Sequence, residues 1–240
     1  MGRPNRVDVA GYAYHVLNRS VGRRAIFRKD ADFAAYERVL AGALVRSAGG
    51  VELLAYCLMG NHWHLVVRTS RDGALAPFMK WLTLTHTQRY RVAHQSVGEG
   101  PLYQGRYKAF LIETGEHLLS VCRYVERNAA RAALVERAEA WPWSSLARWR
   151  QGGAAGSDED PPLALAPWPT DGGAVASDGS GRPKQWLRTV NTPLSEAELD
   201  ALRRAAQRGR PYGGEAWTKQ MIARFGLGST LRGPGRPRKE

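Results

Sequence analysis

Two histidines flank a tryptophan in the sequence His62-Trp63-His64, inside a strongly apolar stretch. If this stretch is a β-strand, side chains two residues apart point to the same face of the sheet, about 7 Å apart along the chain. Both imidazoles could then bind one divalent cation while Trp63 turns to the buried opposite side. Because His-x-His is a short pattern, the sequence leaves open that both are ordinary hydrogen-bonded histidines.

Tyr124 and Asn128 are four residues apart in a segment with helical periodicity, a spacing that places two side chains on one helix face. The tyrosine could act as a nucleophile, and the amide oxygen could orient it or complete a metal shell. Most helix tyrosines are core residues, so this pair alone does not establish a site. Tyr90 is a second candidate, but it follows Arg89 in a basic helix, which is typical of a face that contacts phosphates. We therefore rank Tyr124 ahead of Tyr90 as the nucleophile.

The elements around these residues follow a regular order. Two apolar runs separated only by Gly60-Asn61 predict a tight hairpin. Helical periodicity, capping residues and β-branched content predict further elements on both sides of it. The expected strands cover 12–18, 51–59, 62–68 and 106–112, and the expected helices cover 30–46, 74–93 and 114–128. This β-α-β-β-α-β-α order predicts an α+β fold, a ferredoxin-like antiparallel sheet with helices on one face.

In such a sheet the first strand lies beside the strand that carries His62 and His64. His15 belongs to that first strand. It is either a partner behind the two histidines or a strand histidine held by the backbone.

Composition divides the rest of the chain. Fifteen of the 35 residues in 151–185 are Gly, Pro or Ser, which predicts a flexible linker between a catalytic domain (1–150) and a basic helical region (186–240). In that region Ser195 and Glu198 form a capping box that starts a helix, and Gly209 with Pro211 ends it. The helices over 195–225 are either a small DNA-binding module or a lid on the catalytic domain.

The chain of 240 residues carries a net charge of +13, and this charge is concentrated at its ends. Residues 1–28 sum to +5 and residues 202–240 to +8, whereas 29–201 sum to zero. This distribution indicates a nucleic-acid partner held by the two ends, with the chemistry in a neutral body. Neither end shows a basic amphipathic helix for a membrane surface, and no apolar run approaches the length of a membrane span. With two cysteines and no Cys-x-x-Cys pair, we expect a cytoplasmic, nucleoid-associated protein.

The tripeptide Gly-Arg-Pro occurs four times, at 2–4, 181–183, 209–211 and 235–237. An arginine between glycine and proline can enter a narrow minor groove, as in AT-hook peptides. The last copy looks most like such a hook and predicts three DNA contacts, Arg236, Arg238 and Lys239. The copy at 209–211 is equally consistent with a helix end.

These motifs together are similar to a known family. The sequence Gly-Asn-His-Trp-His-Leu over 60–65, with Tyr-His-Val over 14–16, resembles the single-tyrosine HUH transposases, in which a bulky hydrophobe separates the two histidines. Within that superfamily, the segments 102–108, 123–128 and 141–145 resemble the REP-associated tyrosine transposases. The resemblance covers about residues 10–147.

The resemblance implies a mechanism. Tyr124 would attack a phosphodiester in single-stranded or hairpin DNA, leaving a 5′-phosphotyrosine and a free 3′-hydroxyl, and the reaction could be reversed onto another 3′ end without ATP. His62, His64 and Asn128 would hold Mg²⁺ or Mn²⁺. We expect Arg89, Arg106 and Lys108 to contact DNA. The DNA targets implied by the resemblance include palindromic repeats. The protein is expected to be a monomer or a homodimer.

One departure from the family pattern lies beside the site. Relatives commonly follow the motif asparagine with Pro-Val-Arg, whereas this chain has Ala129-Ala130-Arg131. The helix geometry after Asn128 can therefore differ, which bears on Asn128 as a metal ligand.

Two other functions remain open at this level. One is a non-catalytic DNA-binding regulator on the same fold. The other is a zinc hydrolase that uses His62 and His64, although the sequence shows no acidic third ligand near the hairpin.

Overall fold

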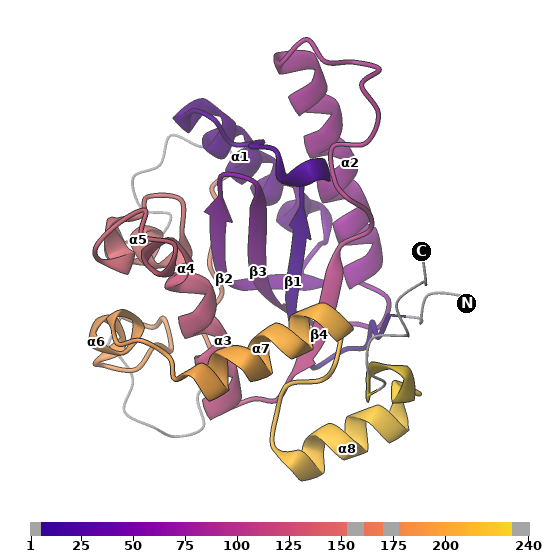
Figure 1. Cartoon of the computed structure of the whole chain (residues 1–240), viewed down its shortest axis with the longest axis vertical. Helices are drawn as coiled ribbons and strands as arrows, with labels where there is room; N and C mark the ends of the chain where they lie inside the picture. Colours follow the sequence, from indigo (N-terminus) through magenta and orange to yellow (C-terminus); the bar gives the residue numbers. More distant parts are fainter. Residues whose placement is uncertain (1–5, 153–160, 170–177, 232–240) are drawn as a thin grey trace, which may run out of the picture.

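A four-stranded antiparallel sheet forms the centre of the molecule (Figure 1). The computed structural model describes residues 6–152, 161–169 and 178–231. The strand order is β2-β3-β1-β4, which confirms the predicted α+β, ferredoxin-like sheet. The strands are β1 (Ala13–Arg19), β2 (Val51–Met59), β3 (His62–Thr69) and β4 (Lys108–Ile112). The helices are α1 (Asp30–Arg46), α2 (Leu75–Ala93), α3 (Glu116–Glu126), α4 (Asn128–Arg131), α5 (Ser145–Arg150), α6 (Trp186–Asn191), α7 (Glu196–Arg208) and α8 (Glu215–Arg224).

The β2–β3 hairpin sets the register of the sheet. Its turn is the predicted Gly60-Asn61, and Met59 pairs with His62 directly after it. Further along β2 the register shifts between Leu53 and Ala55. Such a bulge places two consecutive residues on one side of a strand. Both Leu54 and Ala55 accordingly belong to the core cluster on the same side of the sheet.

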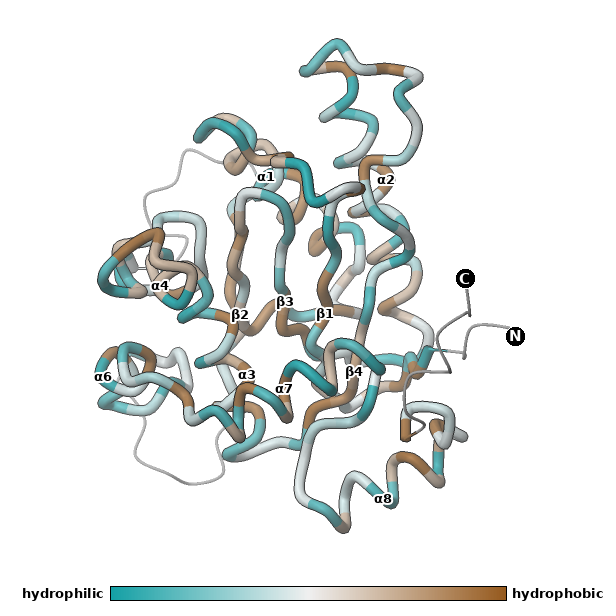
Figure 2. Tube along the Cα trace, viewed as in Figure 1, coloured by the Kyte–Doolittle hydropathy of each residue, from teal (hydrophilic) through white to brown (hydrophobic). Residues whose placement is uncertain are grey.

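Helices cover both faces of the sheet, each with its own hydrophobic core (Figure 2). Helices α1 and α2 pack on one face, around Trp63 and Leu65, as the predicted fold requires. The opposite face carries Val66 and Phe110 and is covered by α3 and by helices that follow it in the chain. This second layer is additional to the expected helices on one face. It explains why β2 is buried on both sides.

The prediction of a flexible linker over 151–185 is wrong for two of its described parts, 161–169 and 178–185. The first part runs along the free edge of β2, where the backbone of Ala166 donates to the carbonyl of Leu53 (2.8 Å). The indole of Trp168 donates to the carbonyl of Leu54 (2.8 Å), and its ring is buried. Although rich in Gly and Pro, residues 161–169 and 178–185 therefore form irregular chain that packs on the sheet and not a solvated spacer. We call these two described parts the strap.

The second part of this strap corrects the reading of the Gly-Arg-Pro copy at 181–183. A Cβ at Gly181 would overlap the carbonyl oxygen of Trp168, so only glycine fits this close approach, and its φ of +72° also favours glycine. Arg182 is 1% exposed and cannot reach a DNA groove.

The C-terminal helices pack against the sheet. Helix α7 begins at Ser195 with the predicted capping box and ends at Gly209 in a left-handed conformation. It contacts β4, and Tyr212 behind it adds one parallel bridge to Ile112 at the open edge of β4. Of the two alternatives for this region, the structure shows α7 lying on the domain that contains the sheet. Across the described ranges, no helix combines the length and apolar character needed to cross a membrane.

Candidate active site

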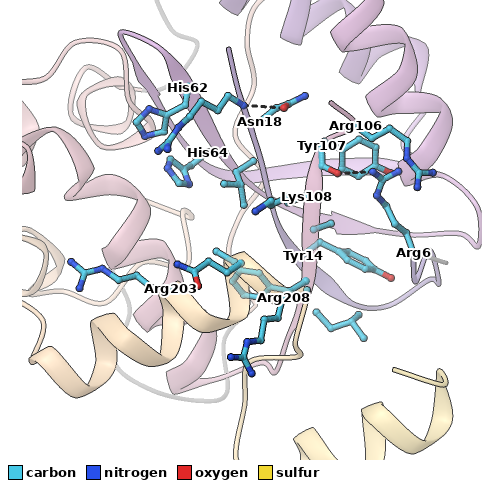
Figure 3. A pocket seen from close by; sticks show the side chains of 18 of the residues that line it. Arg6, Tyr14, Asn18, His62, His64, Arg106, Tyr107, Lys108, Arg203 and Arg208 are labelled. Carbon is cyan, nitrogen blue, oxygen red and sulfur yellow. Dashed lines mark hydrogen bonds between the residues drawn. The ribbon is translucent and has the colours of Figure 1, made fainter. Parts of the chain in front are cut away.

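His62 and His64 lie on the same face of β3, as their spacing predicts, and Trp63 lies in the core on the other face. Figure 3 shows the two imidazoles close together, with α7 across from them. On the neighbouring strand, Arg19 pairs with His62 and Leu17 pairs with His64. The ring centroids of His62 and His64 are 5.0 Å apart.

Hydrogen bonds fix the orientation of both rings. The Nδ1 of His62 is 2.6 Å from the side-chain oxygen of Asn61, and the Nδ1 of His64 is 2.8 Å from the Nε2 of His15. Each ring thus engages Nδ1, and within the described part of the chain neither Nε2 has a hydrogen bond. The structure therefore decides between the two alternatives for His15, because this residue contacts His64 directly.

Burial keeps these imidazoles neutral. It lowers the pKa of His62 to about 4, with smaller contributions from Arg19 and Arg131, and it lowers the pKa of His64 well below its usual value. A neutral imidazole has a lone pair for a cation, so no proton must be removed near pH 7.

Tyr124 reaches the same face from α3. Its ring centroid lies 5.9 Å from that of His64 and 6.2 Å from that of His15, edge-on to both. The ring is 8% exposed, lines the cavity in front of the histidines, and has the guanidinium of Arg131 5.3 Å from its centre. Tyr90, in contrast, is buried between α2 and the opposite sheet face, where it stacks on His94.

A buried carboxylate anchors the helix that carries Tyr124. Glu126 is fully buried and accepts hydrogen bonds from Ser145 (2.6 Å), Arg182 (2.7 Å) and the indole of Trp186 (2.7 Å). Because these partners come from α5, the strap and α6, three distant segments hold one turn of α3. A charged pair buried this deeply is stable only with such additional hydrogen bonds.

Two arginines on the exposed side of α3 add to this anchoring. Arg123 donates to the carbonyl groups of Thr192 and Pro193, and Arg127 donates to those of Val190 and Asn191. These carbonyl groups belong to the end of α6 and the turn after it. The arginines of the family-like motif are therefore structural, whereas Tyr124 faces the cavity.

Asn128 does not offer a free oxygen in this arrangement. It is 1% exposed at the start of α4, and its Oδ1 accepts a 2.5 Å hydrogen bond from Arg131. Its Nδ2 is buried and has no partner in the described ranges of the chain. Helix α3 ends at Glu126, so Tyr124 and Asn128 lie on two consecutive short helices and not on one.

The cavity in front of these residues has a volume of about 750 Å³ and is strongly basic. Carboxylates are missing from its described lining, which comes from β1, β3, β4, α3, α7 and the loops around them. Its cationic side chains are Arg6, Arg19, Arg106, Lys108, Arg131, Arg203 and Arg208. Four of these seven come from the two basic ends of the chain, so the expected separation of a neutral reacting body from basic ends is wrong.

The predicted DNA contacts divide into three groups. Arg106 and Lys108 line the cavity beside the histidines (Figure 3). Arg89 is exposed on α2, which covers the other face of the sheet, so it lies apart from the cavity. Arg236, Arg238 and Lys239 lie outside the described residues.

Sequence reasoning missed the arginines that α7 brings to the cavity, Arg203 and Arg208, and the position of Arg131. The signal for Arg131 is its spacing of three residues from Asn128, which places both on one helix face. For the α7 arginines, the signal was a basic helix with a narrow apolar stripe, in which Leu202 and Ala205 are buried. Such a stripe indicates a helix that packs on the domain.

The chemistry of the side chains at this site bears on whether it can hold a divalent metal. The two free Nε2 atoms fit a shared cation, since both rings are neutral and face one cavity. Among the described residues, no group of three or more His, Cys, Asp or Glu side chains could hold a metal ion. The protein itself thus supplies two imidazoles, and Asn128 becomes a third ligand only if Arg131 releases its oxygen.

The chain was compared with protein-family models, solved structures and curated proteins. A family model described as IS200-like transposase matches residues 8–128. Among solved structures, a REP-associated tyrosine transposase bound to a REP hairpin is 16% identical with a TM-score of 0.49, covering 63% of this chain and 87% of that one. A protein from Deinococcus radiodurans R1, described as a candidate transposase, is 21% identical with a TM-score of 0.37, covering 52% and 95%. No curated protein matches the sequence.

Proposed function

The chain belongs to the family of IS200-like transposases, and from this premise we propose that it cuts and rejoins DNA strands with Tyr124 as the nucleophile. The observation that carries the proposal is the position of Tyr124. Its ring lies edge-on to the neutral imidazole of His64 and lines the same cavity as His62, a cavity whose described lining has seven cationic side chains. The resemblance to REP-associated tyrosine transposases supports the same assignment.

In the proposed reaction the phenolic oxygen of Tyr124 attacks phosphorus in line with the 3′ oxygen of the scissile bond. The P–O bond to that oxygen breaks, the phenolic proton passes to solvent, and the 3′ oxygen takes up a proton. The products are a 5′-phosphotyrosine and a 3′-hydroxyl. Since one phosphodiester replaces another, attack by a different 3′-hydroxyl reverses the step and joins strands.

The residues of the cavity would have separate tasks. His62 and His64 would hold Mg²⁺ or Mn²⁺ through Nε2, with Asn128 as a possible third ligand. When bound, the cation would polarise a non-bridging oxygen of the scissile phosphate. Arg131, which lies against the Tyr124 ring, would bind another phosphate oxygen and so orient the phosphorus toward the phenol.

The form of the substrate follows from the position of the nucleophile. The Tyr124 ring is mostly buried against the sheet, so a phosphodiester must enter the cavity to reach it. A single strand can bend into such a cavity, whereas a duplex would have to be opened first. We therefore favour single-stranded DNA at the foot of a hairpin as the substrate.

The test is a covalent-adduct assay. The protein is incubated with end-labelled hairpin DNA and Mn²⁺ or Mg²⁺, and products are separated under denaturing conditions. The wild type and Tyr90→Phe should form a protein–DNA adduct, and Tyr124→Phe should form none because it lacks the nucleophilic oxygen.

Each other outcome contradicts the proposal in a recognisable way. An adduct with Tyr124→Phe but not with Tyr90→Phe would show that Tyr90, and not Tyr124, is the nucleophile. Cleavage without an adduct would indicate hydrolysis by water. Tight binding without cleavage would favour the DNA-binding regulator.

A further inference from the structure

His15 and His64 form a hydrogen-bonded pair of imidazoles on neighbouring strands. His15 pairs with Val66 and His64 with Leu17, so the two histidines are diagonal neighbours on one face of the sheet. Their Nε2 and Nδ1 atoms are 2.8 Å apart, and the ring planes differ by only 10°. Since the ring centroids are 5.0 Å apart, the rings lie edge to edge in nearly one plane, which is the geometry of an N–H···N hydrogen bond.

The surroundings of His15 exclude a charged ring. His15 is 1% exposed and packs against Phe110 and Tyr124, and a charged imidazole buried among such rings would be strongly unfavourable. With both rings neutral, a single proton lies between the two nitrogens. This proton is either on Nδ1 of His64 or on Nε2 of His15.

The position of that proton decides what His64 presents to the cavity. If Nδ1 of His64 carries it, Nε2 has a lone pair that faces the cavity. If Nε2 of His15 carries it, Nε2 of His64 must itself be protonated, and this nitrogen cannot bind a cation. A neutral imidazole has one N–H, so the two nitrogens of His64 always have opposite roles.

His15 has a feature that packing alone does not explain. Its Nδ1 is buried and has no hydrogen-bond partner among the residues that the structure describes. An unpaired buried polar atom destabilises the folded state, and an aliphatic side chain in this position would avoid it. The cost of this unpaired Nδ1 is explained if the other nitrogen of His15, Nε2, makes a hydrogen bond that an aliphatic side chain could not make.

We propose that His15 is a positioning residue that accepts the Nδ1–H of His64 and thereby keeps the Nε2 lone pair of His64 directed into the cavity. This inference rests on the proposed function, in which His64 binds a divalent cation. A carboxylate is the more frequent acceptor behind a metal-binding histidine. A neutral imidazole does the same without adding negative charge beside an anionic phosphodiester, and so preserves the positive potential of the cavity.

The experiment uses the full chain without DNA and has two readouts. Long-range ¹H–¹⁵N NMR reports which nitrogen of His64 carries the proton in the metal-free protein, and calorimetric titration with Mn²⁺ gives the affinity. The variants are His15→Leu, which removes the acceptor, and His15→Gln, which offers a neutral carbonyl oxygen instead. The matched control is His86→Leu, because His86 is an equally buried histidine on the other face of the sheet.

In the wild type and in His86→Leu we expect His64 to be protonated on Nδ1. His15→Leu should shift the proton toward Nε2 and weaken Mn²⁺ binding by about 10- to 100-fold. His15→Gln should recover most of the affinity. Circular dichroism of each variant establishes that it is folded, and the wild-type tautomer tests the inference even if His15→Leu does not fold.

The inference is overturned if His64 is protonated on Nε2 in the wild type, if the wild type does not bind Mn²⁺, or if His15→Leu binds Mn²⁺ as the wild type does. These results do not depend on the covalent-adduct assay. Failure of the Tyr124 adduct with the expected His64 tautomer and Mn²⁺ binding would refute the proposed function alone. A normal adduct together with unchanged Mn²⁺ binding by His15→Leu would refute the inference alone.

Discussion

The two faces of β3 differ in what covers their side chains: one face is packed in the core, and the other borders a cavity. On one face Trp63 is fully buried, and its indole donates to Tyr103 (3.1 Å), which in turn bonds to His86 (2.6 Å). On the other face His62 and His64 border an open basic cavity, and each has an Nε2 without a hydrogen bond among the described residues. Alternation along one strand thus separates a packed core from the lining of an open cavity. The buried tryptophan sets the register that directs both histidines into the cavity.

The largest expected effect is on stability and compares two neighbouring residues of β3 that point to opposite faces. Trp63→Ala should lower the free energy of unfolding by about 3–5 kcal/mol, because it leaves a cavity in a packed core. His62→Ala should change it by about 1 kcal/mol or less, since the His62 side chain borders the open cavity. Chemical denaturation of both variants measures the difference. Equal losses would show that the two faces do not differ as described.

A second prediction concerns the anchoring of α3 above the open face. Arg182→Met should destabilise the protein by about 3 kcal/mol, because the carboxylate of Glu126 would remain buried without its cationic partner. Combining Arg182→Met with Glu126→Gln removes that buried charge and should recover most of the lost free energy of unfolding. Arg210→Met is the matched control, since Arg210 lies in another Gly-Arg-Pro copy but is exposed. Comparable unfolding midpoints for Arg182→Met and Arg210→Met would contradict a structural role for Arg182.

The third prediction involves little change in stability but tests the open face directly. Replacing Arg203 and Arg208 by Gln should weaken DNA binding and lower the salt dependence of log Kd by about 2, if each arginine contacts one phosphate. Fluorescence anisotropy with labelled hairpin DNA at several salt concentrations measures both. Arg204→Gln is the control on the same helix, because Arg204 is exposed and does not line the cavity. An unchanged salt slope in the double variant would place the DNA elsewhere.

Local patterns predicted much of this molecule. The Gly60-Asn61 turn, the capping box at Ser195 and the period of two around Trp63 all describe interactions between residues close in sequence, and all are present. The proximity of Tyr124 to His64 followed from the family resemblance and not from the pattern of either segment.

What the sequence did not reveal depends on residues far apart in the chain. Composition marks the strap as a spacer, and only the three-dimensional structure pairs Arg182 with Glu126, 56 residues away. The same holds for the basic C-terminal end, whose Arg203 and Arg208 join the cavity because α7 packs beside β4. Charge summed along a chain does not report where those charges meet in space.

The strap also has a consequence for how the protein is made. Trp168 bonds to Leu54 of β2 across a separation of 114 residues, so this part of the strand's edge stays uncovered until the strap has left the ribosome. Residues 8–128 match the family model, yet during synthesis they expose a sheet edge and the carboxylate of Glu126. Exposed edges pair readily with other chains. The shortest segment that folds cleanly on its own must therefore extend well beyond the part that carries the chemistry, through Trp186.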